Sequence, residues 1–240
     1  MSYVMSLTKH IPNTITCLNL ICGIAGIIAC FSLRFDWSFY FMLAAIVFDF
    51  CDGLSARALG AYSELGKQLD SLSDLVSFGV LPALILNRMM LSMTWSDSPI
   101  CYLPLMFAVF AALRLAKFNI DTEQSESFRG LATPAAAILC GALAYYTVVE
   151  PYGFLAEWSR NLWFIPCLTA VLCCLMVSRV EMFSFKFHKG QGRGTRVFVK
   201  RVFIVAFAVC ILAACLILQM NWSLAVIATI LTYILTAILA

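Results

Sequence analysis

The sequence predicts an all-α integral membrane protein, a bundle of about eight transmembrane helices. Of its 240 residues, 62% are hydrophobic and 12% are charged, whereas soluble chains have about 45–50% and about 25%. The mean hydropathy is +0.93. Apolar runs without barrel-like alternation recur along the chain with short polar breaks. Because lipid cannot satisfy backbone hydrogen bonds, each run is expected to be a helix of roughly 20 residues.

Eight apolar segments fit this requirement, and no soluble domain stands apart from them. The polar first eleven residues do not fit a secretory signal, so the first segment is expected to be a retained helix. We therefore expect a single domain over residues 1–240. The predicted spans are 14–33, 37–57, 68–90, 99–118, 132–149, 162–179, 200–219 and 222–239.

The distribution of lysine and arginine predicts the orientation, because these residues are retained on the cytoplasmic side. With the N-terminus inside, thirteen cations lie on the cytoplasmic side and three, Arg34, Arg88 and Arg160, on the other. Both termini are then cytoplasmic. The cytoplasmic cations are Lys9, Arg57, Lys67, Arg114, Lys117, Arg129, Arg179, Lys186, Lys189, Arg193, Arg196, Lys200 and Arg201.

The basic loop 179–201 has two interpretations. It either touches anionic lipid headgroups as a positive-inside signal or forms a specific site for an anionic substrate. Nothing in the charge pattern indicates nucleic acid. The eleven cysteines lie mostly in apolar runs, with no CxxC pair and no histidine nearby, so we expect them to be packing residues rather than zinc ligands or disulfides.

The first predicted helix opens with polar residues on one face. Pro12 fits a helix start, and Asn13, Thr16 and Asn19 recur three residues apart. Such groups turn toward the bundle interior. They serve either as caps and interhelical hydrogen-bonding groups or as ligands, and their level, at the same surface as the acidic stretch below, favours ligand roles for Asn13 and Thr16.

Four carboxylates between residues 49 and 74 need an explanation in so apolar a chain. Asp49 and Asp52 share one helix face, and the next helix places Asp70 and Asp74 one turn apart. The two acidic pairs can therefore converge at one point. Such a cluster is stabilised by divalent cations, and all-oxygen ligands beside a phosphate favour Mg²⁺ or Mn²⁺, in one or two ions.

A cation close to these acids indicates a phosphorylated ligand. Arg57, eight residues after Asp49, can grip phosphate oxygens in a bidentate manner. A metal-bridged pyrophosphate fits this arrangement, and a carboxylate not fully engaged with metal can deprotonate an attacking hydroxyl. The competing hypothesis is a divalent-cation transporter, although the acids are predicted at the membrane surface rather than at its midplane.

These residues form a recognisable motif. The chain matches the pattern DxxDGxxAR, followed by a G after eight residues and by two further D, each after three more residues. This pattern resembles the motif of the CDP-alcohol phosphatidyltransferases. The eight matching positions are Asp49, Asp52, Gly53, Ala56, Arg57, Gly66, Asp70 and Asp74.

The resemblance implies that a hydroxyl attacks the lipid-side phosphate of CDP-diacylglycerol and that CMP leaves. The four aspartates would hold two divalent ions, with Asp74 as the base. Gly53 and Ala56 would let the cytidine approach the helix, and Arg57 would hold phosphate. Gly66, Asn13 and Thr16 are assigned to the same substrate, whose acyl chains would stay in the bilayer.

Other stretches look like the phosphatidylserine synthase branch, which implies serine as acceptor, a catalytic core over 12–190 and additional C-terminal helices over 200–239. Two positions depart from that branch, Ala132 where proline is usual and Lys117 where arginine is usual. The stretches are 12–19, 113–119, 128–134 and 175–178.

Several polar residues near the predicted inner surface are candidates for binding serine. Arg114, Lys117, Asn119 and Arg129 are assigned to this role, the three cations because they can hold the serine carboxylate. For Arg114 an ion pair or a positive-inside anchor is an equal alternative. Glycerol 3-phosphate, inositol phosphate and choline remain alternative acceptors. The resemblance also implies a homodimer. We expect a bacterial-type inner membrane, and the charge distribution predicts an active site at its cytoplasmic face.

Overall fold

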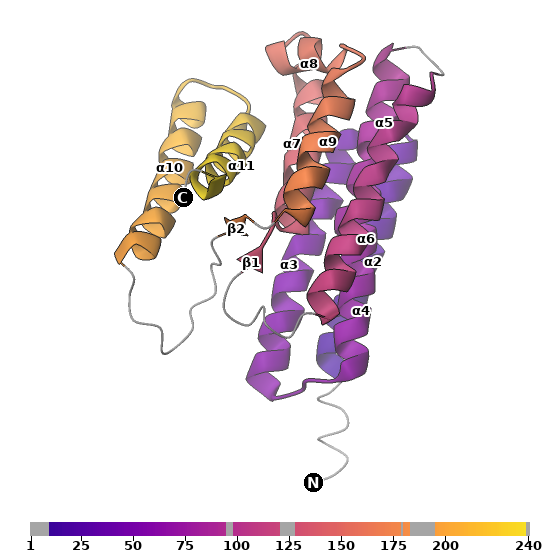
Figure 1. The fold of residues 1–240 in the computed structure, drawn as a ribbon. Helices are drawn as coiled ribbons and strands as arrows, with labels where there is room; N and C mark the ends of the chain where they lie inside the picture. Colours follow the sequence, from indigo (N-terminus) through magenta and orange to yellow (C-terminus); the bar gives the residue numbers. More distant parts are fainter. Residues whose placement is uncertain (1–9, 95–97, 121–127, 179, 183–194, 239–240) are drawn as a thin grey trace.

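The computed structural model is a helical bundle with one very short strand pair (Figure 1). It describes residues 10–94, 98–120, 128–178, 180–182 and 195–238. The helices are α2 (His10–Phe31), α3 (Phe35–Leu59), α4 (Glu64–Asp74), α5 (Leu81–Thr94), α6 (Met106–Ile120), α7 (Thr133–Val149), α8 (Phe154–Ser159), α9 (Phe164–Val177), α10 (Thr195–Ile217) and α11 (Trp222–Ile238); the strands are β1 (Phe128–Arg129) and β2 (Glu181–Met182).

The helical segments follow the predicted spans with shifted ends. Four segments are long and apolar enough to cross a membrane: His10–Phe31, Phe35–Leu59, Glu64–Met93 and Pro99–Ile120. The later apolar helices are shorter, with 10 to 17 residues in their apolar parts. The all-helical membrane architecture is thus supported, whereas eight crossings and cytoplasmic termini stay predictions. Most of the basic loop 179–201 lies outside the described residues.

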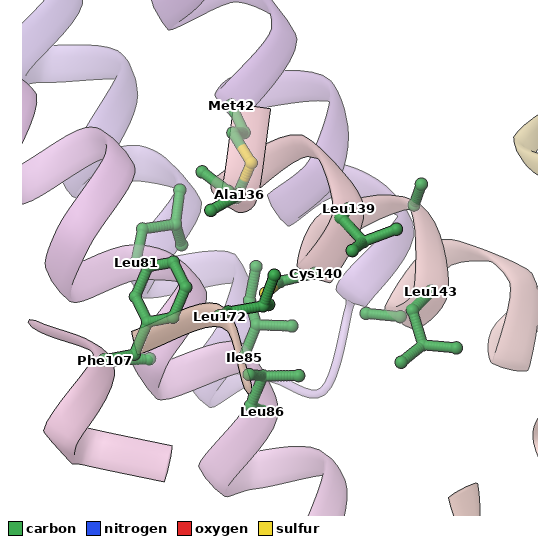
Figure 2. Close-up of a cluster of buried hydrophobic side chains, with 14 of the residues drawn as sticks. Met42, Leu81, Ile85, Leu86, Phe107, Ala136, Leu139, Cys140, Leu143 and Leu172 are labelled. Atoms are coloured by element: carbon green, nitrogen blue, oxygen red, sulfur yellow. The ribbon is translucent and has the colours of Figure 1, made fainter. Parts of the chain in front are cut away.

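The core lies where α3, α5, α6, α7 and α9 meet (Figure 2). Helix α7 passes through the centre and buries nearly every side chain from Ala136 to Thr147. The cysteines are all free. Five of them are buried, which fits the packing role expected of them, whereas four are exposed. Labelled core residues are Met42, Leu81, Ile85, Leu86, Phe107, Ala136, Leu139, Cys140, Leu143 and Leu172.

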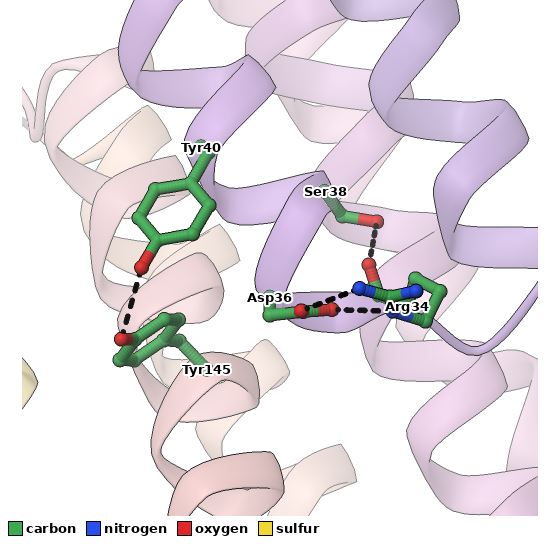
Figure 3. A network of polar contacts seen from close by, with 5 residues as sticks. All are labelled: Arg34, Asp36, Ser38, Tyr40 and Tyr145. Carbon is green, nitrogen blue, oxygen red and sulfur yellow. Dashed lines mark hydrogen bonds and ion pairs between the residues drawn. The ribbon is translucent and has the colours of Figure 1, made fainter.

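A polar network fixes the N-terminal end of α3 (Figure 3). Arg34 forms a salt bridge of 3.1 Å with Asp36, and Ser38 Oγ donates to the Arg34 carbonyl at 3.1 Å. Tyr40 and Tyr145 join α3 to α7 through a hydroxyl–hydroxyl hydrogen bond of 3.1 Å. The acidic motif begins nine residues beyond Tyr40 on the same helix, so this network holds the bundle about 14 Å away from it.

Helix α4 continues directly into a π-helical turn, Leu75–Val80, before α5 begins. This irregularity starts at the residue after Asp74. The turn packs against α2, because Ser77 Oγ donates to the Asn19 carbonyl at 3.1 Å and a Cβ on Gly23 would collide with Ser77 Oγ. π-Helical turns are often found at functional sites, and this one places Asp74 against α2.

The strand pair joins two stretches that lie far apart in the sequence. Residues 128–129 pair antiparallel with 181–182. The Gly130 amide donates to the Val180 carbonyl at 2.9 Å and the Leu131 amide to the Leu175 carbonyl at 3.0 Å. The start of α7 is therefore tied to the end of α9. The predicted spans did not include this pair or α8, because two strand residues and a six-residue helix are too short to leave a periodic pattern.

Gly130 should be the least replaceable glycine of the connections. Its φ is +79°, and an added Cβ would lie 2.5 Å from the Met176 carbonyl oxygen. Left-handed backbone costs an L-residue about 1–2 kcal/mol, and the backbone clash adds to this. We expect Gly130→Ala to lower the free energy of unfolding by several kcal/mol, at least about 2 kcal/mol more than Gly60→Ala. Thermal unfolding in detergent micelles measures the difference.

Gly60→Ala is the matched control. Gly60 ends α3 with φ +59°, and a Cβ there would meet nothing within 4 Å. It therefore carries the left-handed strain without the clash. Equal losses of stability in the two variants would show that the close approach of Gly130 to α9 contributes nothing.

Candidate functional site

The turn between α3 and α4 brings the two acidic pairs face to face. Gly60 ends α3 in the left-handed conformation. Ser63 then caps α4, because its Oγ accepts from the Gly66 amide at 3.0 Å. Asp49 and Asp52 lie near the end of α3, and Asp70 and Asp74 lie in the last turns of α4. The expected convergence of two helix ends is thus observed.

Three of the four carboxylates form one close group. Asp49, Asp70 and Asp74 each offer an oxygen, and these oxygens all lie within 4.8 Å of one another. Asp52 lies beside them, near enough to interact with the charge of Asp74, but it is buried and its Oδ2 accepts a hydrogen bond of 2.6 Å from Thr16 Oγ1. The structure therefore distinguishes a group of three from a fourth carboxylate that is held by α2.

This donor set suits a hard divalent cation. The donors are all carboxylate oxygens, which favour Mg²⁺ and Mn²⁺ over zinc or copper. Three like charges at this separation repel one another unless a cation lies among them. The residues present thus fit a divalent metal, while the identity and number of ions stay predictions.

The polar face of α2 forms one wall of the site. Thr16 donates to Asp52 as described above, and Asn19 Nδ2 donates to Asp74 Oδ1 at 3.2 Å. Ser73 Oγ on α4 donates in turn to the Thr16 carbonyl at 3.2 Å. Asn13 lies against Gly66, where a Cβ would be 2.9 Å from Asn13 Oδ1. The first helix therefore contacts the carboxylates directly.

Asn19 is a site residue that the assignment from sequence left out. Its place on the face of Asn13 and Thr16 was the available signal, because the three residues are spaced three apart. Its depth in the helix hid its role, since a buried asparagine in a membrane helix is usually an interhelical hydrogen-bonding group. In the structure it is both, because the hydrogen bond that it makes between helices goes to Asp74.

The end of α3 offers open space beside the carboxylates. A Cβ on Gly53 would meet no atom closer than Arg57 Nη1, at 3.7 Å. Arg57 is exposed, and Ala56 is half-buried. By contrast, Gly66 is a close-packing position between Asn13 and Ser63. Room for a ligand is thus visible over Gly53, whereas a substrate contact of Gly66 stays a prediction.

The residues assigned to serine separate into different settings. Arg114 on α6 lies near enough to Asp74 for their charges to interact, and its Nη1 donates to Thr133 Oγ1 at 3.3 Å. Asn119 joins α6 to α4, because its Nδ2 donates to Ser71 Oγ at 2.8 Å. Lys117 is exposed, and the backbone of Arg129 lies in β1. Among the three whose side chains the structure describes, Arg114 is the one with an electrostatic interaction with a carboxylate of the group.

Comparison with known proteins gives consistent results. A family model described as CDP-alcohol phosphatidyltransferase matches residues 9–164. Similar curated proteins are each named CDP-diacylglycerol–serine O-phosphatidyltransferase. The protein from Bacillus subtilis is 31% identical over 188 residues, 77% of this chain and 96% of the relative. That from Mycobacterium leprae is 32% identical over 83% of this chain and 66% of the relative, and that from Helicobacter pylori 32% over 73% and 72%.

Proposed function

The chain belongs to the CDP-alcohol phosphatidyltransferase family, and from that premise we propose that it transfers the phosphatidyl group of CDP-diacylglycerol to the hydroxyl of L-serine, which gives phosphatidylserine and CMP. The observation that supports this class of reaction is the group of three carboxylates near the open space over Gly53 of α3. The assignment of serine as acceptor is based on these relatives. Each is named CDP-diacylglycerol–serine O-phosphatidyltransferase, and each aligns with most of this chain.

Four carboxylates would hold the metal. Asp49, Asp70 and Asp74 would ligate it directly, and Asp52 would complete the site from the α2 side. When bound, a divalent ion neutralises negative charge on the pyrophosphate and on departing CMP. Thr16 and Asn19 keep two of these carboxylates in fixed positions, because each donates a hydrogen bond to one of them.

Asp74 is assigned as the general base. Asn19 donates to its Oδ1, which fixes the carboxylate against α2. The serine hydroxyl would give its proton to Asp74 while its oxygen bonds to the lipid-side phosphorus, and the bond from that phosphorus to the CMP oxygen breaks. The pair of electrons leaves with CMP. Positioning of the hydroxyl against both phosphorus and base contributes most to such a transfer.

CDP-diacylglycerol would lie along the end of α3. The cytidine would pack over Gly53 and Ala56, where the surface has room, and Arg57 would hold phosphate oxygens. Asn13 and Thr16 would border the same space from α2. The family and the apolar helices make this an integral membrane protein, so the acyl chains would remain in the bilayer beside the bundle.

Location and assembly follow as further proposals. The excess of lysine and arginine at the carboxylate end supports an active site at the cytoplasmic face. Bacterial relatives support a bacterial-type inner membrane. The homodimer rests on the family resemblance, and exposed apolar side chains of α10 such as Val209 and Leu216 offer surface for it or for lipid.

An acceptor screen tests the proposed function. Purified protein in mixed micelles of CDP-diacylglycerol should release CMP when L-serine and Mg²⁺ or Mn²⁺ are added. Little CMP should appear with glycerol 3-phosphate, inositol phosphate or choline. CMP release with one of these and not with serine would contradict the serine assignment. Absence of CMP release with every alcohol, together with uptake of divalent cations into proteoliposomes, would favour a transporter instead.

Arg114→Ala should affect serine more than the lipid substrate. Arg114 lies near enough to Asp74 for their charges to interact, and a guanidinium there can hold the serine carboxylate. Loss of a charge-assisted hydrogen bond removes about 1.5–3 kcal/mol of binding, roughly a 10- to 100-fold rise in the serine KM. The KM for CDP-diacylglycerol should change by less than about threefold. Steady-state CMP release with each substrate varied in turn measures both constants, and equal changes would count against serine binding at Arg114.

A further inference from the structure

A shallow groove runs between the end of α2 and the start of α3, on the surface of the bundle. Its volume is about 430 Å³, within the range of about 300–1,000 Å³ that is usual for ligand sites. Ala25, Ala29 and Ser32 line one wall, and Trp37 and Phe41 line the other. Arg34 lies at the end of the groove, in the turn that joins the two helices. The groove is thus apolar along most of its length and polar at one end.

The groove is formed by parts of the two helices that are fixed against each other. Ser38 Oγ donates to the Gly26 carbonyl at 3.0 Å, and a Cβ added to Gly26 would lie 3.5 Å from the Phe41 Cβ. Helices α2 and α3 therefore touch at Gly26. Beside this contact, the short side chains of Ala25 and Ala29 leave space between the helices. A hydrocarbon chain can fill this space and gain van der Waals contacts with both walls.

The position of the groove in the bilayer follows from α2 and α3, which are both long and apolar enough to cross the membrane. The turn between them is then at a membrane surface, and the exposed indole of Trp37 fits the level of the headgroups. From Ser32 to Ala25 the groove follows α2 for about 10 Å toward the bilayer centre. The polar end of the groove therefore faces lipid headgroups, and its apolar part faces acyl chains.

Arg34 offers a hydrogen-bond donor at the polar end of the groove, because its side chain is 58% exposed. Asp36 accepts from Arg34 Nε at 3.2 Å and from Arg34 Nη2 at 3.1 Å (Figure 3), which fixes the direction of the guanidinium. Arg34 Nη1 has no hydrogen bond within the part of the chain that the structure describes. A phosphate oxygen is a strong acceptor for such a donor. Because Asp36 offsets the charge of Arg34, this end suits the phosphate itself rather than a headgroup with net negative charge.

We propose that the groove binds one phospholipid of the leaflet opposite to the carboxylate end of α3. One acyl chain lies along the groove from Ser32 to Ala25, and the phosphate accepts a hydrogen bond from Arg34 Nη1. Arg34 precedes Asp49 by fifteen residues, about 22 Å along α3, so this lipid is distinct from the lipid substrate at the other end of the helix. The bound lipid covers the junction of the two helices that position Asp49 and Asp52.

Ala29→Phe tests the proposal, because the new ring would occupy the groove. Native mass spectrometry of purified protein titrated with phosphatidylethanolamine should show a single additional bound lipid on the wild-type chain relative to this variant. Ala213→Phe is the matched control, because Ala213 is exposed on α10 and lies outside the groove. The control should bind as many lipids as the wild type. Equal numbers of lipids on Ala29→Phe and on the wild type would overturn the proposal.

The lipid that Ala29→Phe displaces should need a phosphate. Phosphatidylethanolamine and phosphatidylglycerol should compete for the site with affinities within about threefold of each other, because both carry the phosphodiester. Diacylglycerol, which has the same acyl chains without phosphate, should bind at least about tenfold more weakly, as for the loss of a charge-assisted hydrogen bond. Equal affinities for diacylglycerol and phosphatidylethanolamine would overturn the proposal.

Arg34→Gln is a second variant, which leaves the groove open and keeps the test decisive if Ala29→Phe does not fold. It should weaken the binding of phosphatidylethanolamine by about tenfold. Arg160→Gln is its control, because Arg160 is also exposed and its Nη2 donates to the Pro151 carbonyl at 2.8 Å, outside the groove. Equal weakening in the two variants would show a general effect of surface charge and would overturn the proposal.

A second copy of the chain is the competing occupant of this groove. If a second copy covered it, Ala29→Phe would change the number of chains per particle, as measured by light scattering, and leave the number of bound lipids unchanged. That result would overturn the proposal. The binding measurements need neither serine nor turnover, so their outcome does not depend on the proposed function.

Discussion

Asp74→Asn should lower kcat for CMP release by about 10²- to 10⁴-fold, the contribution usual for a general base. Asp74 is the last residue of α4, and Asn19 fixes one of its oxygens. An asparagine keeps the shape and an oxygen ligand but cannot take a proton. Metal affinity should therefore fall by less than about tenfold. Single-turnover CMP release and Mn²⁺ binding followed by electron paramagnetic resonance measure the two effects.

Asp36→Asn is the control for this variant. Asp36 is likewise an aspartate, but it lies in the first turn of α3, paired with Arg34. The kcat of Asp36→Asn should stay within about twofold of the wild-type value, because the substitution changes no charge near Asp49, Asp70 and Asp74. If Asp74→Asn lost Mn²⁺ binding in proportion to activity, Asp74 would be a metal ligand and not the base. An unchanged kcat would exclude both roles.

Removal of divalent metal should abolish CMP release. Three carboxylates within 4.8 Å leave the pyrophosphate facing uncompensated negative charge unless a cation is bound. Activity should disappear after treatment with EDTA and return with Mg²⁺ or Mn²⁺. Asp49→Ala, which removes the oxygen ligand altogether, should raise the Mn²⁺ concentration needed for half-maximal binding by at least about tenfold, as measured by titration of the metal-free protein.

Glu157→Gln controls for a general effect of surface charge. Glu157 lies on α8, where it is exposed, so its replacement should leave the Mn²⁺ requirement unchanged. Full activity in protein with less than stoichiometric residual metal, measured by mass spectrometry, would show that the carboxylates act without a cation. An equal shift in both variants would show that the measured Mn²⁺ binding is not at this group.

The carboxylate site could be predicted from helical periodicity, because its four aspartates lie close together in the sequence. Asp49 and Asp52 lie on one helix and Asp70 and Asp74 on the next, and a four-residue connection fixes how they face each other. The polar face of α2 was also predicted, since Asn13, Thr16 and Asn19 follow one period. The long helical segments were found for the same reason.

Contacts between distant segments could not be predicted from periodicity. The distinct place of Asp52 depends on Thr16, thirty-six residues away, and Arg114 of α6 is hydrogen-bonded to Thr133 of α7. The tie between Gly130 and α9 depends on two short stretches with no regular pattern. Asn119 was assigned to serine by its place in a family-like stretch, whereas the structure shows it bonded to Ser71.

The π-helical turn at Leu75–Val80 has a consequence for the helix that contains it. A π-turn accommodates one more residue than an α-turn, so residues from Leu81 onward are rotated by about 100° relative to an uninterrupted α-helix. Asp70 and Asp74 before the turn and Leu81 and Ile85 after it consequently have separate rotational phases. Deleting one residue from the turn would remove this rotation between the two parts of the helix. Either the carboxylates or the core side chains would then face the wrong neighbours.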